Sequence, residues 1–135
     1  MGDRTTCTLW LSATAAENLR DTIAALYYEP EEAQHGCLIF NEVNYGYLPQ
    51  ELAQALDEQK IDFIWFWRDG GGYPPGMEIH CDGEIAEWNC NRDGDIILTV
   101  DEIKDPVMVT SALEWDEICS RIIQSAIPHE TEPPA

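Results

Sequence analysis

Residues 61–68, Ile-Asp-Phe-Ile-Trp-Phe-Trp-Arg, carry the strongest strand signal in the chain. Phe63, Trp65 and Trp67 occupy alternate positions and therefore share one face of an extended strand, while the residues between them make the other face apolar as well. Strands that are apolar on both faces lie inside a sheet that is covered on both sides. We therefore expect a central strand here, with Trp65 and Trp67 in the core.

Two strands and two helices are expected before this central strand. Residues 6–11 and 37–45 have the composition of strands. Thr14-Ala-Ala-Glu17 fits a capping box, in which the Thr hydroxyl and the Glu carboxylate bind unpaired N–H groups at a helix start. Pro49 indicates the first turn of a second, shorter helix.

Hairpin signals dominate the second half of the chain. Asp82-Gly83 and Asp93-Gly94 are two-residue turn signals, and together they predict a three-stranded meander over residues 77–100. Ser111-Ala-Leu-Glu114 is a second capping box and predicts a last helix that ends before Pro128. The expected fold class is α+β, with about three helices packed on a mainly antiparallel sheet of about five to six strands, the meander included.

Length and composition predict one domain over residues 1–127 and a disordered tail over residues 128–135. A chain of 135 residues suits a single domain, and 44% apolar and 10% aromatic residues are enough to build a core.

The net charge is the most unusual property of the sequence. Twenty-six acidic residues against seven Lys and Arg give a formal net charge of −19, whereas a small domain usually carries a charge of about 2 to 8 in magnitude. Such a chain repels nucleic acids and anionic membranes. We therefore expect no direct nucleic-acid or membrane contact, and any macromolecular partner should be basic.

Cysteine usage indicates a reducing compartment. The five cysteines are odd in number and widely spaced, which favours reduced thiols in a cytoplasmic protein over a disulfide framework. No apolar run approaches the roughly 20 residues that span a bilayer. Residues 1–6 carry no signal-peptide pattern, although a mature chain whose signal has been removed fits equally well.

Metal and catalytic sites are weakly indicated. Residues 89–96 overlay the start of an EF-hand loop, but Val100 stands where that loop needs a bidentate Glu, so a hairpin turn is favoured. His80, Cys81 and Cys90 could supply zinc ligands, yet the close Cys pairs typical of structural zinc sites are absent. Nothing marks any Cys as an activated nucleophile. We expect no metal, cofactor or catalytic residue, and interpret the chain as a non-enzyme.

The acidic residues are concentrated in one part of the chain. Residues 78–117 hold twelve of them, opposed by Arg92 and Lys104, so this stretch carries −10. The alternatives are a solvated surface without a partner and a binding surface, and the size of the charge favours the second. Tyr45 and Tyr73 join the candidates because Tyr is enriched in binding hot spots. The expected binding residues are Glu78, Asp82, Glu84, Glu87, Asp93, Asp95, Asp101, Glu102, Tyr45 and Tyr73.

In size, charge and lack of a catalytic motif, the chain resembles the small acidic inhibitors of phages and plasmids, such as DNA-mimic anti-restriction proteins and anti-CRISPR proteins. The resemblance implies carboxylates that imitate phosphates and occupy a basic, nucleic-acid-binding groove of a bacterial defence complex. Immunity proteins that neutralise basic nuclease toxins look similar and stay an alternative. A third hypothesis is a small enzyme or ligand-binding domain with the Trp-rich strand as its pocket and residues 70–76 as its lid.

Overall fold

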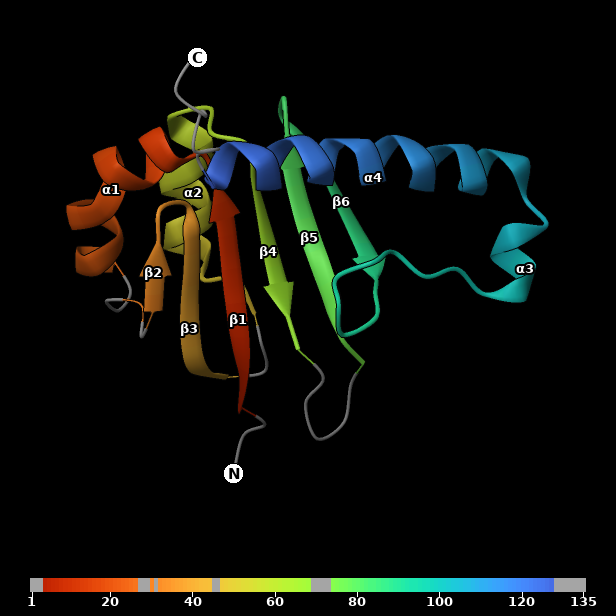
Figure 1. Ribbon diagram of the computed structural model, residues 1–135, viewed down its shortest axis with the longest axis horizontal. Coiled ribbons are helices and arrows are strands. Elements are labelled where there is room, and N and C mark those ends of the chain that lie inside the picture. Colours follow the sequence, from red (N-terminus) through yellow and green to blue (C-terminus); the bar gives the residue numbers. More distant parts are fainter. Residues whose placement is uncertain (1–3, 27–29, 31, 45–46, 69–73, 128–135) are drawn as a thin grey trace, which may run out of the picture.

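Six strands form one antiparallel sheet, in the order β2-β3-β1-β4-β5-β6, and four helices lie on or beside it (Figure 1). The computed structural model describes residues 4–26, 30, 32–44, 47–68 and 74–127. The elements are β1 (Arg4–Leu11), α1 (Ala13–Leu26), β2 (Glu32–Gln34), β3 (Cys37–Asn44), α2 (Gln50–Glu58), β4 (Phe63–Trp67), β5 (Gly76–Cys81), β6 (Glu84–Asn89), α3 (Val100–Ile103) and α4 (Pro106–Ala126). The expected α+β class is confirmed.

Strand β4 lies inside the sheet, between β1 and β5, as its two apolar faces predict. Phe63 and Trp65 are fully buried on one side, and Ile64 is buried on the other. Trp67 is partly buried and packs against the first cluster, so both tryptophans of this strand contribute to the core.

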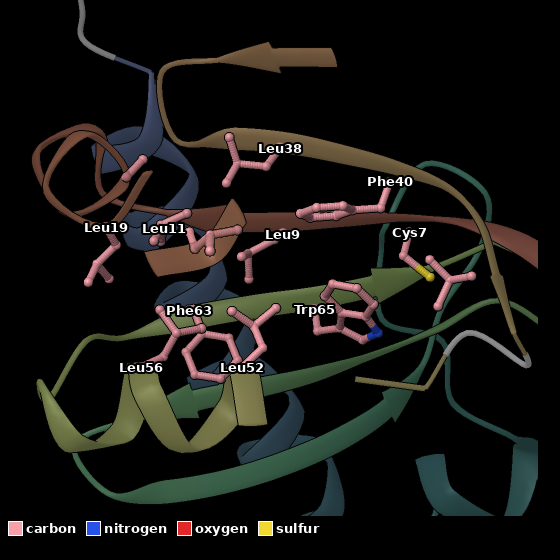
Figure 2. Close-up of a cluster of buried hydrophobic side chains, with 13 residues drawn as sticks. Cys7, Leu9, Leu11, Leu19, Leu38, Phe40, Leu52, Leu56, Phe63 and Trp65 are labelled. Atoms are coloured by element: carbon pink, nitrogen blue, oxygen red, sulfur yellow. The ribbon is translucent and has the colours of Figure 1, made fainter. Parts of the chain in front are cut away.

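The first face of the sheet is covered by α1 and α2. Figure 2 shows Leu52 and Leu56 of α2 pointing toward Phe63 and Trp65 of β4. The ring of Phe40 on β3 lies 6.0 Å from that of Trp65, centroid to centroid. Each large side chain buried in this way contributes about 1.5–3 kcal/mol, so this face holds most of the apolar core.

The second face is covered by α4, which crosses β1, β4 and β5. Cys119 and Ile122 of the helix pack against Ile64, Met77 and Ile79 of the strands. The amino-terminal part of α4 and the short helix α3 extend beyond the β6 edge of the sheet (Figure 1). No helix within the described ranges is both long and apolar enough to cross a membrane.

Two helices begin earlier than their capping boxes predict. Helix α1 begins at Ala13, and the Oγ of Ser12 accepts the N–H of Ala15 at 3.1 Å. Helix α4 begins at Pro106, where the Asp105 carboxylate accepts the N–H of Val107 at 3.0 Å. Asp followed by Pro is a strong signal for a helix start. The Asp carboxylate caps the helix, and proline fits the first turn because the N–H that it lacks would have no partner there.

The expected three-stranded meander is wrong in its third strand. Strands β5 and β6 form the first hairpin, but after β6 the pairing is reduced to one bridge between Cys90 and Ile96. The Asn91 carboxamide oxygen accepts the N–H groups of Asp93 and Asp95 at 3.0 and 2.9 Å, which folds these residues into a compact turn. A capping box at Thr99 then starts α3, so the chain leaves the sheet before a strand can form.

Gly36 joins three parts of the fold. It lies in the turn between β2 and β3, its carbonyl accepts the N–H of Leu11 at 3.0 Å, and its own N–H donates to the carbonyl of Ala126 at 2.8 Å. A Cβ at this position would stand 1.8 Å from the Leu11 carbonyl oxygen. The close approach of β1, this turn and the end of α4 therefore requires glycine.

We expect Gly36→Ala to lower the free energy of unfolding by about 3 kcal/mol, because backbone atoms must move to admit the methyl group. Gly83→Ala is the matched control: its φ of +81° is also unfavourable for alanine, but nothing lies within 4 Å of the added carbon, so about 1 kcal/mol is expected. Urea unfolding measures both. An equal or smaller loss for Gly36→Ala would contradict this account.

Candidate functional site

The candidate site is the β5–β6 hairpin at one end of the sheet, together with the turn that follows it (Figure 1). Asp82 and Gly83 connect the strands with φ values of 51° and 81°, as in a type I′ turn. In such a hairpin the flanking residues, Cys81 and Glu84, form a hydrogen-bonded pair, and the pairs alternate from there. The hairpin is therefore regular, and the direction of each of its side chains follows from the register.

Most of the acidic side chains expected to bind are exposed. Of the twelve acidic residues in 78–117, ten are exposed and two, Glu78 and Glu102, are half-buried. We call the five exposed ones on the hairpin and its following turn the hairpin carboxylates: Asp82, Glu84, Glu87, Asp93 and Asp95. All five are exposed to solvent, although the Asp95 carboxylate accepts a hydrogen bond from Asn91 Nδ2 at 3.2 Å and that of Asp82 lies 3.8 Å from the Cys81 thiol.

The hairpin carboxylates surround the edge of the sheet rather than lining one face. Residues of β6 alternate between faces, so Glu84 projects on the same side as Trp88, toward α4, and Glu87 on the opposite side. Asp82 lies in the turn at one end of β6, and Asp93 and Asp95 lie in the turn beyond the other end. A partner that contacts all five must approach the edge strand itself.

Glu78 has a structural role that the sequence did not reveal. Its Oε1 lies 2.8 Å from Nε2 of His80, and Nδ1 of the same imidazole lies 3.4 Å from Oδ1 of Asp57 on α2. The His80 ring is buried and stacks on Phe63 with the centroids 4.2 Å apart. Glu78 is thus engaged by His80 and contributes less to a binding surface than its charge suggests.

The other expected residues differ in their surroundings. Glu102 accepts the N–H of Thr99 at 2.9 Å and completes the capping box of α3, which occupies its carboxylate. Asp101 is exposed on α3. Tyr45 and Tyr73 lie outside the described residues, so their predicted role stays a prediction.

The donor atoms of Asp62, Cys81 and Asp82 lie within 4.8 Å of one another, close enough to share an ion. The Cys81 thiol lies 3.6 Å from an Asp62 carboxylate oxygen, and the other oxygen accepts the N–H of Asp82 at 3.1 Å. Burial and these carboxylates raise the pKa of the Cys81 thiol to about 11. The thiol is therefore protonated at neutral pH, and the three groups satisfy one another.

The zinc set considered from sequence is not assembled. His80 and Cys81 are adjacent on β5, so their side chains point to opposite faces of the sheet. Burial is also the main cause that raises the pKa values of Cys7, Cys90 and Cys119 to about 12. These thiols lack the thiolate character that a nucleophile requires.

Residues 70–73 of the lid expected for a small enzyme lie outside the described residues, so a pocket at the Trp-rich strand stays a prediction. Trp65 is completely buried in the core. One hollow, of about 530 Å³, lies beside α1 and is lined in part by Glu17, Arg20 and His35. Another, of about 620 Å³, lies between the end of α2 and the hairpin turn and is lined largely by charged groups. Neither hollow includes a tryptophan of β4.

Comparison of the chain with protein-family models, with curated proteins and with solved structures finds no match. The properties of the hairpin are therefore the basis for any functional argument.

Part of the geometry of the hairpin can be predicted from the sequence. An Asp-Gly turn predicts the hairpin, and the odd spacing between Glu84 and Glu87 predicts that they occupy opposite faces. Glu78 and His80 are two residues apart on a predicted strand, so the alternation of side chains already places them on one face, whereas the contact of Asp62 with the turn joins residues 20 positions apart. The second of these contacts depends on the pairing of β4 with β5, which the local pattern does not specify.

Glu78 and Glu87 lie directly opposite each other on β5 and β6. Because they form a non-hydrogen-bonded pair, their side chains are close and repel each other. We expect Glu87→Lys to raise the free energy of unfolding by about 0.5 kcal/mol, since it replaces a like-charge pair with an opposite-charge pair.

A double-mutant cycle with Glu78→Gln, followed by urea unfolding, isolates this interaction. The gain from Glu87→Lys should shrink when Glu78 is neutral. A gain that is the same in both backgrounds would show that only the overall charge matters, and a loss would contradict the proposed repulsion.

Proposed function

We propose that this protein is an acidic inhibitor that covers a basic, nucleic-acid-binding surface of a bacterial defence complex, as an anti-CRISPR or anti-restriction protein of a phage or plasmid does. The observation that carries the proposal is the set of hairpin carboxylates, which project on both sides and at both ends of the outermost strand. The binding residues are these five and Asp101, with Tyr45 and Tyr73 as proposed aromatic contacts.

Electrostatics favours a basic partner. A net charge of −19 attracts a cationic surface over a distance limited by the ionic strength and accelerates association. A nucleic-acid-binding groove presents clustered Lys and Arg. The small anions that accompany these side chains in the free partner are released when the carboxylates of the inhibitor bind, as they are when phosphates bind. The proposed inhibitor therefore competes with nucleic acid for the same side chains.

The dimensions of the hairpin fit a phosphate-binding groove. The six residues of β6 extend over about 20 Å, which is close to the axial rise of about six nucleotides in duplex DNA. Carboxylates at both ends of this strand and on both of its sides can reach the two walls of a groove. A flat acidic face would contact one wall only.

The repulsion between the carboxylates supports a functional reason for keeping them. Directly opposed like charges such as Glu78 and Glu87 destabilise a sheet. A Lys or Arg in place of Glu87 would instead form an opposite-charge pair with Glu78. Binding to a cationic partner removes the repulsion and compensates for its cost.

An immunity protein that neutralises a basic nuclease toxin is the second candidate, since it would use the same carboxylates against the same kind of groove. The identity of the captured partner separates the two candidates: a multisubunit defence complex supports the first, and a secreted nuclease domain supports the second.

The test is capture of a basic partner from bacterial extract by the immobilised protein, followed by surface plasmon resonance at two ionic strengths. In one variant Glu84, Glu87, Asp93 and Asp95 are replaced by Lys. In the control variant, Lys replaces four exposed acids of α1 and α2, namely Glu17, Asp21, Glu51 and Glu58, so its net charge equals that of the hairpin variant.

We expect the hairpin variant to associate at least about tenfold more slowly, the control to lose less than about threefold, and affinity to fall steeply with salt. Replacing one of these four carboxylates by Lys should lower the binding free energy by only about 0–1 kcal/mol. Equal losses in both variants would contradict a specific hairpin surface. A flat salt response, or a partner without a basic surface, would contradict the proposed function.

A further inference from the structure

We propose that the edge of β6 binds an extended, basic segment of the partner protein as a seventh strand of the sheet. The inference rests on the proposed function, because it specifies how the basic partner is held. It goes further in assigning the affinity to main-chain hydrogen bonds in addition to charge.

The register of the hairpin determines which backbone groups point outward. Cys81 and Glu84 flank the two-residue turn and form a hydrogen-bonded pair, so the N–H and C=O groups of Glu84, Ala86 and Trp88 point toward β5. The bond from Cys90 N–H to the Pro75 carbonyl, at 3.2 Å, continues this pattern. The N–H and C=O groups of Ile85 and Glu87 therefore point away from the sheet.

Among the described residues, backbone pairing on this edge occurs only at its far end. The Ile97 N–H donates to the Asn89 carbonyl at 3.0 Å, and Cys90 forms its bridge with Ile96. Within the described part of the chain, β6 pairs with no strand other than β5, so the edge from Glu84 to Trp88 is open. An open edge of this length is a template for another strand.

The two edges of the sheet differ. The opposite edge, β2, has three residues, which is a common way to make an edge unsuitable for pairing. Strand β6 has six residues and contains no proline, and Ile85 is 60% exposed. Its protection consists of the carboxylates of Glu84 and Glu87, which discourage acidic or neutral strands and attract basic ones.

The side chains of β6 define the segment that fits. Glu84 and Glu87 each favour a Lys or Arg beside them, and Ile85 and Ala86 between them favour apolar residues. A matching strand therefore carries two basic residues separated by two apolar ones. The next position is also apolar, because it lies against Trp88.

The groove beside Trp88 supports the same occupant. A hollow of about 460 Å³ lies between β6 and the helices α3 and α4, lined in part by Trp88, Ile97, Met108 and Trp115. The buried indole Nε1 of Trp88 has no acceptor among the residues that the structure describes. This nitrogen is covered by protein atoms, so a partner does not reach it; an apolar side chain of the added strand can instead fill the hollow beside the Trp88 and Trp115 rings.

A second copy of this chain is a poor occupant of the edge. Pairing two β6 strands brings Glu84 and Glu87 of one copy next to the same residues of the other, and each copy carries −19. Opposed like charges destabilise cross-strand pairs. The charge of the edge therefore selects a basic partner over self-association.

The test uses a short synthetic peptide in which two lysines flank two valines and a further valine follows. One control peptide has the same composition with the lysines adjacent, and another carries N-methyl groups at alternate residues, which block main-chain pairing. Amide hydrogen exchange and titration by nuclear magnetic resonance, with the full chain at moderate salt, measure binding and its location.

We expect the first peptide to slow exchange of the Ile85 and Glu87 amides at least about tenfold, and the N-methylated peptide to bind at least about tenfold more weakly. Ile85→Pro removes one outward N–H without breaking a bond to β5, and should weaken binding by a similar factor. Ile85→Ala, the matched control, keeps the N–H and should lose less than about threefold.

Equal binding of the N-methylated peptide, or unchanged exchange of both amides, would overturn strand addition. Concentration-dependent protection of these amides without peptide, together with dimers in sedimentation, would show that a second copy occupies the edge and would also overturn the proposal. These results are independent of partner capture: a partner captured through the hairpin carboxylates without amide protection leaves the proposed function standing and removes this inference.

Discussion

The two apolar faces of β4 are the constraint on which the rest of the structure depends. Phe63 and Trp65 must be covered on one side and Ile64 on the other, so helices are required on both faces of the sheet. The centre of the sheet is then closed to carboxylates, which cannot be buried without partners. The acidic residues therefore lie mostly at the surface: twelve are in residues 78–117, on the outer hairpin, its following turn, α3 and α4, and others are exposed on α1 and α2.

This distribution gives much of the charge a definite location. The buried His80 lies between Asp57 and Glu78 and occupies the carboxylate nearest the core. The carboxylates farther out, such as Glu84 and Glu87, surround an open strand edge. Charge and unpaired backbone groups thus coincide at β6, and this coincidence connects the proposed inhibitor function with strand addition as the mode of contact.

The sequence predicts the parts of the fold that depend on local patterns. The two apolar faces of β4 and the Asp-Gly turn at Asp82 identify a central strand and an acidic hairpin correctly. The missing third strand of the meander depends on competition, because Asn91 closes a turn and Thr99 starts a helix within a few residues of each other. The contact of Glu78 with His80 is local, because residues two apart on a strand share a face, but the approach of Asp57 on α2 to the same imidazole depends on how the helix packs and no local pattern specifies it.

The central claim is that the hairpin carboxylates form the contact surface. Chemical labelling of carboxylates with a carbodiimide and an amine tests it most directly, and mass spectrometry identifies the labelled residues. The protein is labelled alone and in complex with its captured partner. The account predicts reduced labelling of Asp82, Glu84, Glu87, Asp93 and Asp95, and unchanged labelling of the exposed acids Glu17, Asp21, Glu51 and Glu58 on α1 and α2. Protection of the helix acids with full labelling of the hairpin would contradict it.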